Sequence, residues 1–252
     1  MHNKPFHAPV KHPKRVLDIG CGTGSMTIQL AQRFPEAQVI GLDISPVPPM
    51  HNKPTNVQYI QGDIRELAKN AEWAAAFDPE GFGYIFSRFL LFGVPDWPAH
   101  IANIASLLAP GGWVELQEPE MGIYGRDELC ISDDWYWQRQ FLKDCSAYGF
   151  DIVIGKKLAQ YMGATGLVNI QETKYKWPVA VIPAQPETNL MLEINKKQNI
   201  PMQEHLLKKV CKDRHTAEEL ERMKEEMRKT VQEYKEGDHA RLFVAVGQKP
   251  IK

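Results

Sequence analysis

Cysteine is scarce in this chain, whose 252 residues include only Cys21, Cys130, Cys145 and Cys211. None of these forms a close pair in the sequence, and no Cys/His cluster has the spacing of a zinc finger. A scaffold built on disulfides is therefore excluded, and we expect no metal site. The thiols are expected to be reduced, as in a cytoplasmic protein.

Long apolar runs and an excess of one charge sign are absent as well. No stretch approaches about 18 uninterrupted apolar residues, and the polar, proline-containing start lacks the apolar segment of a signal peptide. The net charge is −1 at pH 7, which does not favour binding to nucleic acid or to an anionic membrane. We expect a cytoplasmic protein without nucleic-acid or membrane partners, and the sequence leaves its oligomeric state open.

Residues 16–24, Val-Leu-Asp-Ile-Gly-Cys-Gly-Thr-Gly, form a glycine loop that lacks the marks of two phosphate-binding motifs. Gly20 and Gly22 fit the dinucleotide fingerprint, but the sixth position is Ser25 and the third glycine, Gly24, comes one place early. No Gly-Lys-Ser/Thr follows, so a P-loop is excluded. Asp18 would repel a pyrophosphate, whereas it suits an ammonium or a sulfonium. The loop therefore favours S-adenosylmethionine, with Asp18, Gly20, Cys21, Gly22 and Gly24 in contact with it.

Two further acids close the next apolar runs. Asp43 follows the second run and is placed to accept hydrogen bonds from ribose hydroxyls, and Asp63 follows the third and is placed to accept one from the adenine amino group. Their neighbours Ile44 and Ile64 are expected to sandwich the adenine ring. Any one of these acids alone is better explained as a helix cap or turn residue. Three acids that close successive runs indicate a nucleoside-binding α/β domain.

Strand and helix patterns alternate through the first half, which predicts a parallel sheet with helices on both faces. The expected strands are 15–19, 38–43, 57–61, 83–86 and 113–117, and the expected helices are 24–34, 64–77 and 97–109, with a break at 110–112. In the second half we expect helices over 133–148, 155–165 and 216–236, and strands over 168–177 and 242–246. The stretch 183–239 is a helical insertion before the final strand, and part of it is expected to cap the substrate.

Four further segments carry a resemblance to a known family. They are Lys-Pro-Phe-His-Ala-Pro-Val at 4–10, Asp-Ile-Ser-Pro at 43–46, Asp-Trp-Pro at 96–98 and Pro-Gly-Gly-Trp-Val-Glu-Leu-Gln-Glu at 110–118. With the glycine loop and the acids, they make the chain resemble the Rossmann-like S-adenosylmethionine-dependent methyltransferases, and within them the fungal secondary-metabolite group of LaeA-like proteins. The resemblance implies one domain over 1–252, with a doubly wound, mostly parallel seven-stranded sheet of order 3-2-1-4-5-7-6 whose last strand is antiparallel. It also implies a cofactor site that includes Ser87 and Arg88 after the fourth strand.

Methyl transfer requires a base only if the acceptor is a hydroxyl group that is not already ionised. The best-placed candidate bases are Glu118, Glu120 and His7, and His100 and His205 are weaker ones. Each of them alone more often has a structural role. Glu115 in the middle of a buried strand requires a partner, for which we expect Arg88. Arg88 also disfavours a catalytic metal beside the cofactor.

The function that these features favour is methyl transfer to a small molecule, most simply to an oxygen atom of a secondary metabolite. Two alternatives stay open. One is a non-methylating, pericyclase-like enzyme that binds the cofactor on the same scaffold, and the other is a regulatory protein.

Overall fold

The computed structural model describes residues 5–49, 53–67, 80–180 and 186–251. Its residues group into two compact units. We call residues 1–118, 154–173 and 243–252 the sheet unit, and residues 119–153 and 174–242 the helical unit. The strands β5 (Leu108–Tyr124), β6 (Val168–Pro178) and β7 (His239–Gln248) contribute residues to both units.

Seven strands form one sheet in the order β3-β2-β1-β4-β5-β7-β6, as predicted. The other four are β1 (Arg15–Ile19), β2 (Gln38–Asp43), β3 (Val57–Gln61) and β4 (Phe82–Arg88). Neighbouring strands from β3 across to β5 pair in parallel, and β7 runs antiparallel to them. Parallel pairing brings the carboxyl ends of β1, β2 and β4 to the same edge, where Asp18 and Asp43 lie.

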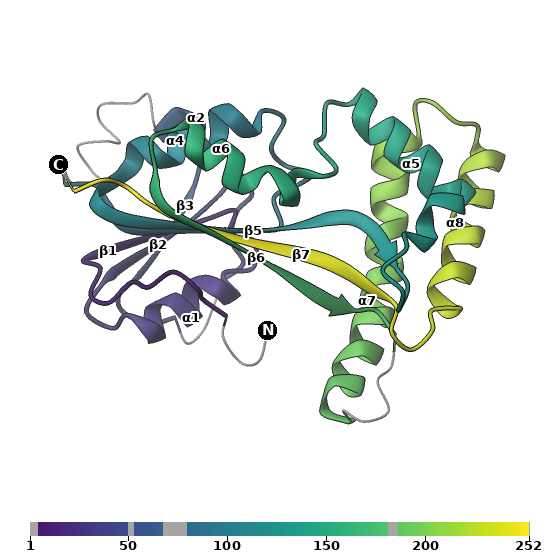
Figure 1. The fold of residues 1–252 in the computed structure, drawn as a ribbon, viewed down its shortest axis with the longest axis horizontal. Helices are drawn as coiled ribbons and strands as arrows, with labels where there is room; N and C mark the ends of the chain where they lie inside the picture. The colour runs from purple at the N-terminus through teal and green to yellow at the C-terminus, as the bar shows by residue number, and fades with distance from the viewer. Residues whose placement is uncertain (1–4, 50–52, 68–79, 181–185, 252) are drawn as a thin grey trace. The chain divides into compact units, whose positions relative to one another are not determined.

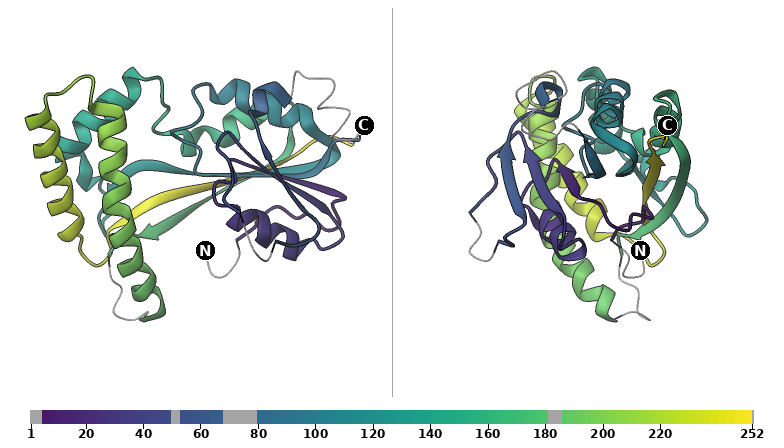
Figure 2. Two further views of the ribbon diagram at one scale, coloured as in Figure 1. Left: turned by 180° about the vertical axis from the view of Figure 1, so that it is seen from behind. Right: turned by 90° about the vertical axis from the view of Figure 1, so that its left-hand side faces the viewer.

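Helices cover both faces of this sheet (Figures 1 and 2). Helix α1 (Ser25–Arg33) lies on one face, and α4 (Trp97–Leu107) and α6 (Leu158–Ala164) lie on the other. Because both faces are covered, β1 is fully buried, and Val16 and Leu17 have no exposed surface. The Asp96 side chain caps α4 by accepting from the amide of Ala99 at 3.0 Å, with Pro98 in the first turn.

The helical unit contains α5 (Tyr136–Ala147), α7 (Pro186–Cys211) and α8 (Ala217–Gln232), which pack on one another. Thr216 and Glu219 form the predicted capping box at the start of α8. Met223 and Met227 are fully buried on its inner face. Within the described residues, no helix is both long and apolar enough to cross a membrane.

The greatest departure from the sequence-based expectations is β5, which runs from Leu108 to Tyr124 rather than over 113–117. Residues 110–112 follow the end of α4, as expected, but they lie inside the strand, where they form a bulge. Phe82 of β4 pairs with Leu108 and Tyr84 pairs with Trp113, so the extra residues loop out between the two pairs. Gly111, at φ 76°, supplies the backbone conformation that such a bulge requires.

Other boundaries differ by smaller amounts. The helix expected over 97–109 ends at Leu107, the one over 133–148 divides into a 3₁₀ turn (Ile131–Asp134) and α5, and the one over 155–165 divides into a 3₁₀ turn (Ile154–Lys157) and α6. Helix α8 ends at Gln232 rather than 236, and β4 and β7 are longer than expected. Helix α2 is described as Ile64–Leu67, and the remainder of the helix expected over 64–77 lies outside the described residues.

Candidate functional site

The glycine loop after β1 is held against the end of β2 by backbone contacts. Gly20 and Cys21 donate their amides to the carbonyl of Leu42, at 2.8 and 3.1 Å. Gly22 donates to the Asp43 carboxylate at 2.8 Å. Asp43 therefore fixes the loop, and its second oxygen accepts from the amide of Ser45.

The three glycines of the loop all have left-handed backbone conformations, with φ 67° at Gly20, 54° at Gly22 and 79° at Gly24. A Cβ at Gly20 would lie 2.2 Å from the Leu90 side chain, so a larger residue would require that side chain to move. A Cβ at Gly22 would meet no atom within 4 Å. The loop thus has open space at Gly22, where a ligand can approach the backbone closely.

Asp18 lies at the end of β1 beside this loop and is only 2% exposed. Its carboxylate accepts a hydrogen bond from the Thr27 hydroxyl on α1 at 2.6 Å. Burial raises the pKa of Asp18 to about 7, and the Thr27 bond and the charge of Arg88 oppose that rise only in part. The charged form of Asp18 is therefore poorly compensated by the protein itself, which favours a cation beside it.

A cavity of about 110 Å³ lies next to Asp18. Asp18 and Arg88 both line it, so one wall carries an acid and another a base. The remaining lining residues come from the glycine loop, the start of α1 and the end of β4: Gly20, Cys21, Thr23, Ser25, Met26, Phe86 and Phe89. Ser87, between Phe86 and Arg88 in the chain, is fully buried, and its hydroxyl has no hydrogen-bond partner among the described residues.

A second, larger cavity of about 570 Å³ lies along the ends of β2 and β3. Four residues predicted from the sequence line it together, namely Asp43, Ile44, Asp63 and Ile64. Ile44 is 69% exposed and Ile64 is buried, so the two offer apolar surface of different accessibility. Its volume suits a nucleoside, and the smaller cavity suits a short charged group.

Asp63 also acts as a turn residue, which is the alternative role considered for any single acid in the sequence. It accepts from the amide and the guanidinium of Arg65, and these contacts lower its pKa. Its carboxylate is thus already engaged by a cation at the rim of the larger cavity.

The sequence missed His100 as a residue of the larger cavity and named it only as a weak base candidate. His100 lies one turn into α4, is 6% exposed, and its Nε2 atom has no partner among the described residues. Burial lowers its pKa to about 4, so the imidazole is neutral near pH 7. A neutral imidazole can hydrogen-bond to an uncharged nucleobase. The only local signal for the position of His100 in the sequence was Asp96, which caps the start of α4.

Among the candidate bases, Glu118 is buried in the sheet unit and lines neither cavity. Its two oxygens accept the amides of Leu90 and Leu91, at 2.7 and 3.1 Å. Burial raises its pKa to about 8. Glu118 therefore holds the segment after β4 that also carries Leu90, the residue packed on Gly20.

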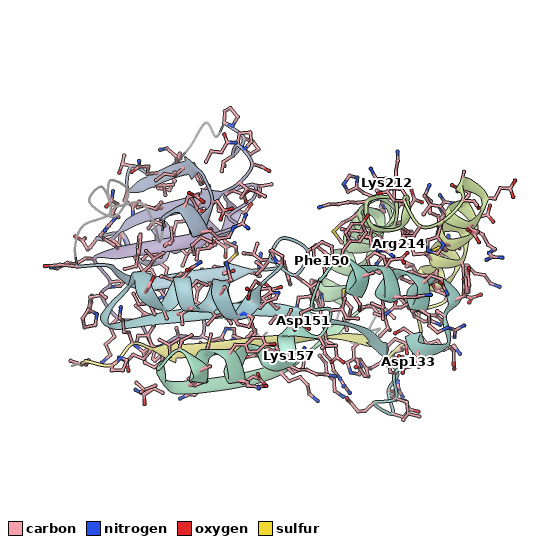
Figure 3. All side chains as sticks on the ribbon, turned by 90° about the horizontal axis from the view of Figure 1, so that it is seen from above. Asp133, Phe150, Asp151, Lys157, Lys212 and Arg214 are labelled. Atoms are coloured by element: carbon pink, nitrogen blue, oxygen red, sulfur yellow. The ribbon has the colours of Figure 1, made fainter. Side chains whose placement is uncertain are left out.

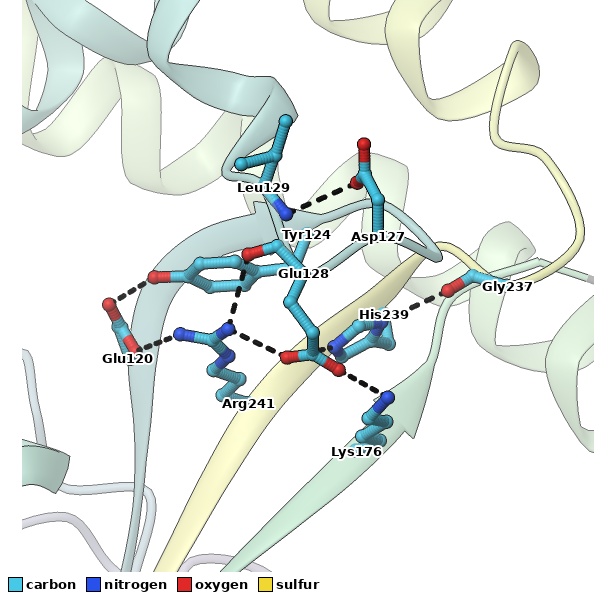
Figure 4. A network of polar contacts seen from close by, with 9 residues as sticks. All are labelled: Glu120, Tyr124, Asp127, Glu128, Leu129, Lys176, Gly237, His239 and Arg241. Carbon is cyan, nitrogen blue, oxygen red and sulfur yellow. Dashed lines mark hydrogen bonds and ion pairs between the residues drawn. The ribbon is translucent and has the colours of Figure 1, made fainter.

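Glu120 belongs to the helical unit, where it joins a network of polar contacts (Figure 4). It accepts from the Tyr124 hydroxyl, and the guanidinium of Arg241 lies 4.0 Å from its other oxygen. Arg241 also stacks 3.4 Å from the centre of the Tyr124 ring and bonds Glu128 at 2.8 Å. His205, the remaining weak candidate outside the sheet unit, is exposed on α7.

The expected pairing of Glu115 with Arg88 is wrong. Glu115 is fully buried and accepts from the amides of His7 and Ala8 and from the Tyr84 hydroxyl, all within 2.9 Å, and the His7 ring lies 3.1 Å from its other oxygen. His7 is thus an anchor for the segment before β1. Arg88 faces the Asp18 cavity, where burial lowers its pKa.

Comparison with known proteins gives the same fold. A family described as "Methyltransferase domain" matches residues 4–172. In solved structures, the phosphoethanolamine N-methyltransferase 2 of Haemonchus contortus has a TM-score of 0.54 at 21% identity and covers 96% of this chain and 50% of its own. At this identity the likeness supports the fold alone.

Two fungal proteins are related in sequence. Methyltransferase pytC of Aspergillus terreus is 26% identical over 202 residues, which are 77% of this chain and 60% of pytC. Secondary metabolism regulator LAE1 of Cochliobolus heterostrophus is 27% identical over 192 residues, 74% of this chain and 59% of its own length. The LaeA-like resemblance is thereby confirmed, and the chain spans about 60% of the length of these relatives.

Proposed function

The chain belongs to the methyltransferase-domain family, and we propose that it transfers a methyl group from S-adenosylmethionine to a small-molecule acceptor, at an oxygen atom of a secondary metabolite. When bound, S-adenosylmethionine supplies an electrophilic methyl group on a sulfonium. The observation that carries the proposal is the pair of cavities at the carboxyl ends of β1, β2 and β4. The smaller has charged walls, and the larger has apolar and polar walls suited to a nucleoside.

The smaller cavity fits the amino-acid end of this molecule. Asp18 is a buried carboxylate that gains from a neighbouring cation, and Arg88 on the same cavity offers a positive charge to a carboxylate. Gly22 leaves room for close approach to the backbone, and the unpartnered hydroxyl of Ser87 lies beside Arg88 in the chain. These residues would bind the ammonium, carboxylate and sulfonium groups together.

The larger cavity fits the adenosine end. A carboxylate has about four acceptor sites, and Asp43 uses two of them for Gly22 and Ser45, so ribose hydroxyls can be bound by the others. Ile44 and Ile64 would flank the adenine ring, and Asp63 or the neutral His100 would bind its polar edge. These assignments extend the sequence-based hypothesis by one residue, His100.

We assign the acceleration to positioning and exclusion of water rather than to a strong base. Neither Glu118 nor His7 lines the cavities, and each has hydrogen-bond partners that hold a neighbouring segment in place. An acceptor held about 3–3.5 Å from the methyl group in line with the breaking bond gains several kcal/mol without proton transfer. An ionised phenol or another group that is nucleophilic at neutral pH would be methylated by such a site.

Transfer of a tritiated methyl group from S-adenosylmethionine into a metabolite extract tests the proposal. Labelled product that requires the protein, together with binding of S-adenosylhomocysteine in calorimetry, is the expected result. If neither S-adenosylmethionine nor S-adenosylhomocysteine binds, the assignment of the site is refuted.

The similarity to LAE1 favours a regulatory protein as the second candidate. The same experiment separates the two functions. Tight cofactor binding without transfer to any acceptor would favour the regulatory role, or a non-methylating enzyme on this scaffold.

A further inference from the structure

Three side chains of kinds that bind metals in other proteins converge in the helical unit. They are Asp144 near the end of α5, Cys211 at the end of α7 and His215 in the connection to α8. One ligand atom from each lies within 4.8 Å of the other two. Asp144 and Cys211 are buried, and the His215 side chain is 11% exposed.

We propose that Asp144, Cys211 and His215 form a site for a single zinc ion that ties α5 to the connection between α7 and α8. Thiolate, imidazole and carboxylate together are a donor set that zinc takes in tetrahedral sites. Bond lengths of about 2.0–2.3 Å place tetrahedral ligands roughly 3.3–3.8 Å apart, so small side-chain movements bring these three atoms to a common ion. Water would complete the fourth position on the accessible side of His215.

The backbone presents Cys211 and His215 in the required way. They are four residues apart, and His215 donates its amide to the carbonyl of Cys211 at 3.1 Å, which closes a tight turn at the end of α7. The intervening residues Lys212 and Arg214 are labelled in Figure 3. Arg214 lies over the ring of Tyr148 at 5.6 Å, just beyond α5, so the turn is fixed next to Asp144.

The orientation of the His215 ring supports a ligand role more specifically. Its Nε2 atom faces Asp144 at 2.7 Å, and its Nδ1 atom faces Glu219 on α8 at 3.9 Å. Metal-binding histidines commonly give their second ring nitrogen to a carboxylate, which fixes the tautomer and strengthens the ligand. Glu219 is in the place of that carboxylate, and it is also the acidic member of the capping box of α8.

The three side chains are joined by hydrogen bonds in the structure. The Cys211 thiol has the Asp144 carboxylate as its hydrogen-bond partner, and the same carboxylate pairs with His215. Burial and Asp144 raise the pKa of Cys211, so the thiol is inert as a nucleophile at neutral pH. Zinc binding would release the thiol proton of Cys211, since a coordinated thiol is deprotonated.

The full chain without an affinity tag, stripped with EDTA, tests the site by titration with zinc against a chromophoric chelator. We expect one tightly held zinc ion per chain and a higher melting temperature with zinc. The cobalt form should show a thiolate-to-metal charge-transfer band in the near ultraviolet. Failure to hold zinc against the chelator, or a cobalt form without that band, would overturn the proposal.

Variants separate this site from adventitious binding by other histidines. Cys211→Ser and His215→Gln should lose the zinc-dependent rise in melting temperature, whereas Cys145→Ser, which removes the buried thiol next to Asp144, should keep it. Glu219→Gln retains the capping box but removes the carboxylate, and should weaken zinc binding about 10–100-fold. Zinc binding unchanged in folded Cys211→Ser would refute the site. If that variant does not fold, the cobalt spectrum of the wild-type chain decides.

Discussion

The hydroxyl of Thr27 on α1 donates to the carboxylate of Asp18 at the end of β1 across 2.6 Å, inside the sheet unit. This is the only hydrogen bond to the Asp18 side chain that the described residues display. Burial raises the pKa of this carboxylate to about 7, so about half of the Asp18 side chains are protonated at pH 7.

Binding of S-adenosylmethionine should weaken as the pH falls through 7. Burial raises the pKa of Asp18 to about 7 in the free protein, and a bound cation favours the ionised form, so protonation competes with the ligand. Well below that pKa, affinity should fall about tenfold for each pH unit until the pKa of the complex is reached. Calorimetry at several values between pH 6 and 8 measures this change in affinity.

The Asp18→Asn variant should bind S-adenosylmethionine about 10–100-fold more weakly than the wild type at pH 8, because it removes the charge and keeps the shape. Its affinity should no longer depend on pH. The folding stability of the free protein should respond to pH in the opposite sense. Because the folded-state pKa of Asp18 is raised, acidification from pH 7 towards 4 should favour folding through this residue. A pH dependence of binding that persists in Asp18→Asn would assign it to another group.

Gly22→Ala should lose cofactor affinity, and Gly149→Ala serves as its matched control. Both glycines have positive φ, 54° and 82°, and a Cβ at either would meet no atom within 4 Å. Both changes should therefore cost about 1–2 kcal/mol of folding free energy through backbone strain alone. Denaturant titration measures this cost in each variant, and calorimetry should show a loss of cofactor affinity only in Gly22→Ala, because only Gly22 belongs to the loop that we propose binds the cofactor. Equal affinity in both variants would contradict the assigned role of the loop.

His100→Phe should weaken binding of the nucleoside end about 3–10-fold, because the neutral imidazole can hydrogen-bond to the base and phenyl cannot. Since burial lowers the pKa of His100 to about 4, the loss should be the same at pH 6 and pH 8. Adenosine competition against labelled cofactor measures it, with exposed His12→Phe as the control. A loss that appears only below pH 7 would indicate a charged His100.

Glu118→Gln should act on stability and cofactor affinity rather than on proton transfer. A glutamine accepts through one oxygen and directs an NH₂ group at the second amide, so one contact with Leu90 or Leu91 is lost, at a cost of about 1–3 kcal/mol. The pH profile of kcat should keep the wild-type shape. A variant that folds normally, binds cofactor normally and transfers methyl groups at a rate no longer dependent on pH would identify Glu118 as the base.

Glu115→Gln should release the segment before β1. Burial alone would raise the pKa of Glu115, but hydrogen bonds from His7, Ala8 and Gln117 outweigh it and hold the pKa below its ordinary value. The carboxylate therefore contributes stability above the ordinary pKa of a glutamate and loses it as the pH falls through the folded-state value. We expect a destabilisation of about 2 kcal/mol at pH 7 that shrinks below pH 4.5, measured by urea unfolding. A difference independent of pH would refute this account.

The parts of the fold that the sequence predicted are those encoded locally. Strands β1, β2 and β3 have the expected bounds because short apolar runs end at a glycine or an acid. The glycine loop and the three acids likewise needed only neighbouring residues. The bulge in β5 was missed because Pro110-Gly111-Gly112 reads as a helix stop, and only its pairing with Phe82 shows that the strand continues.

The parts that were missed depend on residues far apart in the sequence. Glu115 is held by His7, 108 residues away, whereas we expected Arg88 at the end of the neighbouring strand. Likewise, Asp144 meets His215 across 71 residues, so the sequence did not show that these two side chains lie together. Side-chain partners across a sheet or a helix bundle are set by packing, which a single sequence does not display.

The place of β7 between β5 and β6 constrains how the protein is made. Residues 239–248 leave the ribosome after every other strand of the sheet, yet they occupy an interior position. Until they arrive, β5 has an unpaired edge and β6 lacks its neighbour, which invites pairing with other nascent chains. Until then only the five strands from β3 to β5 can pair, so we expect the sheet to be completed only after this last segment has emerged.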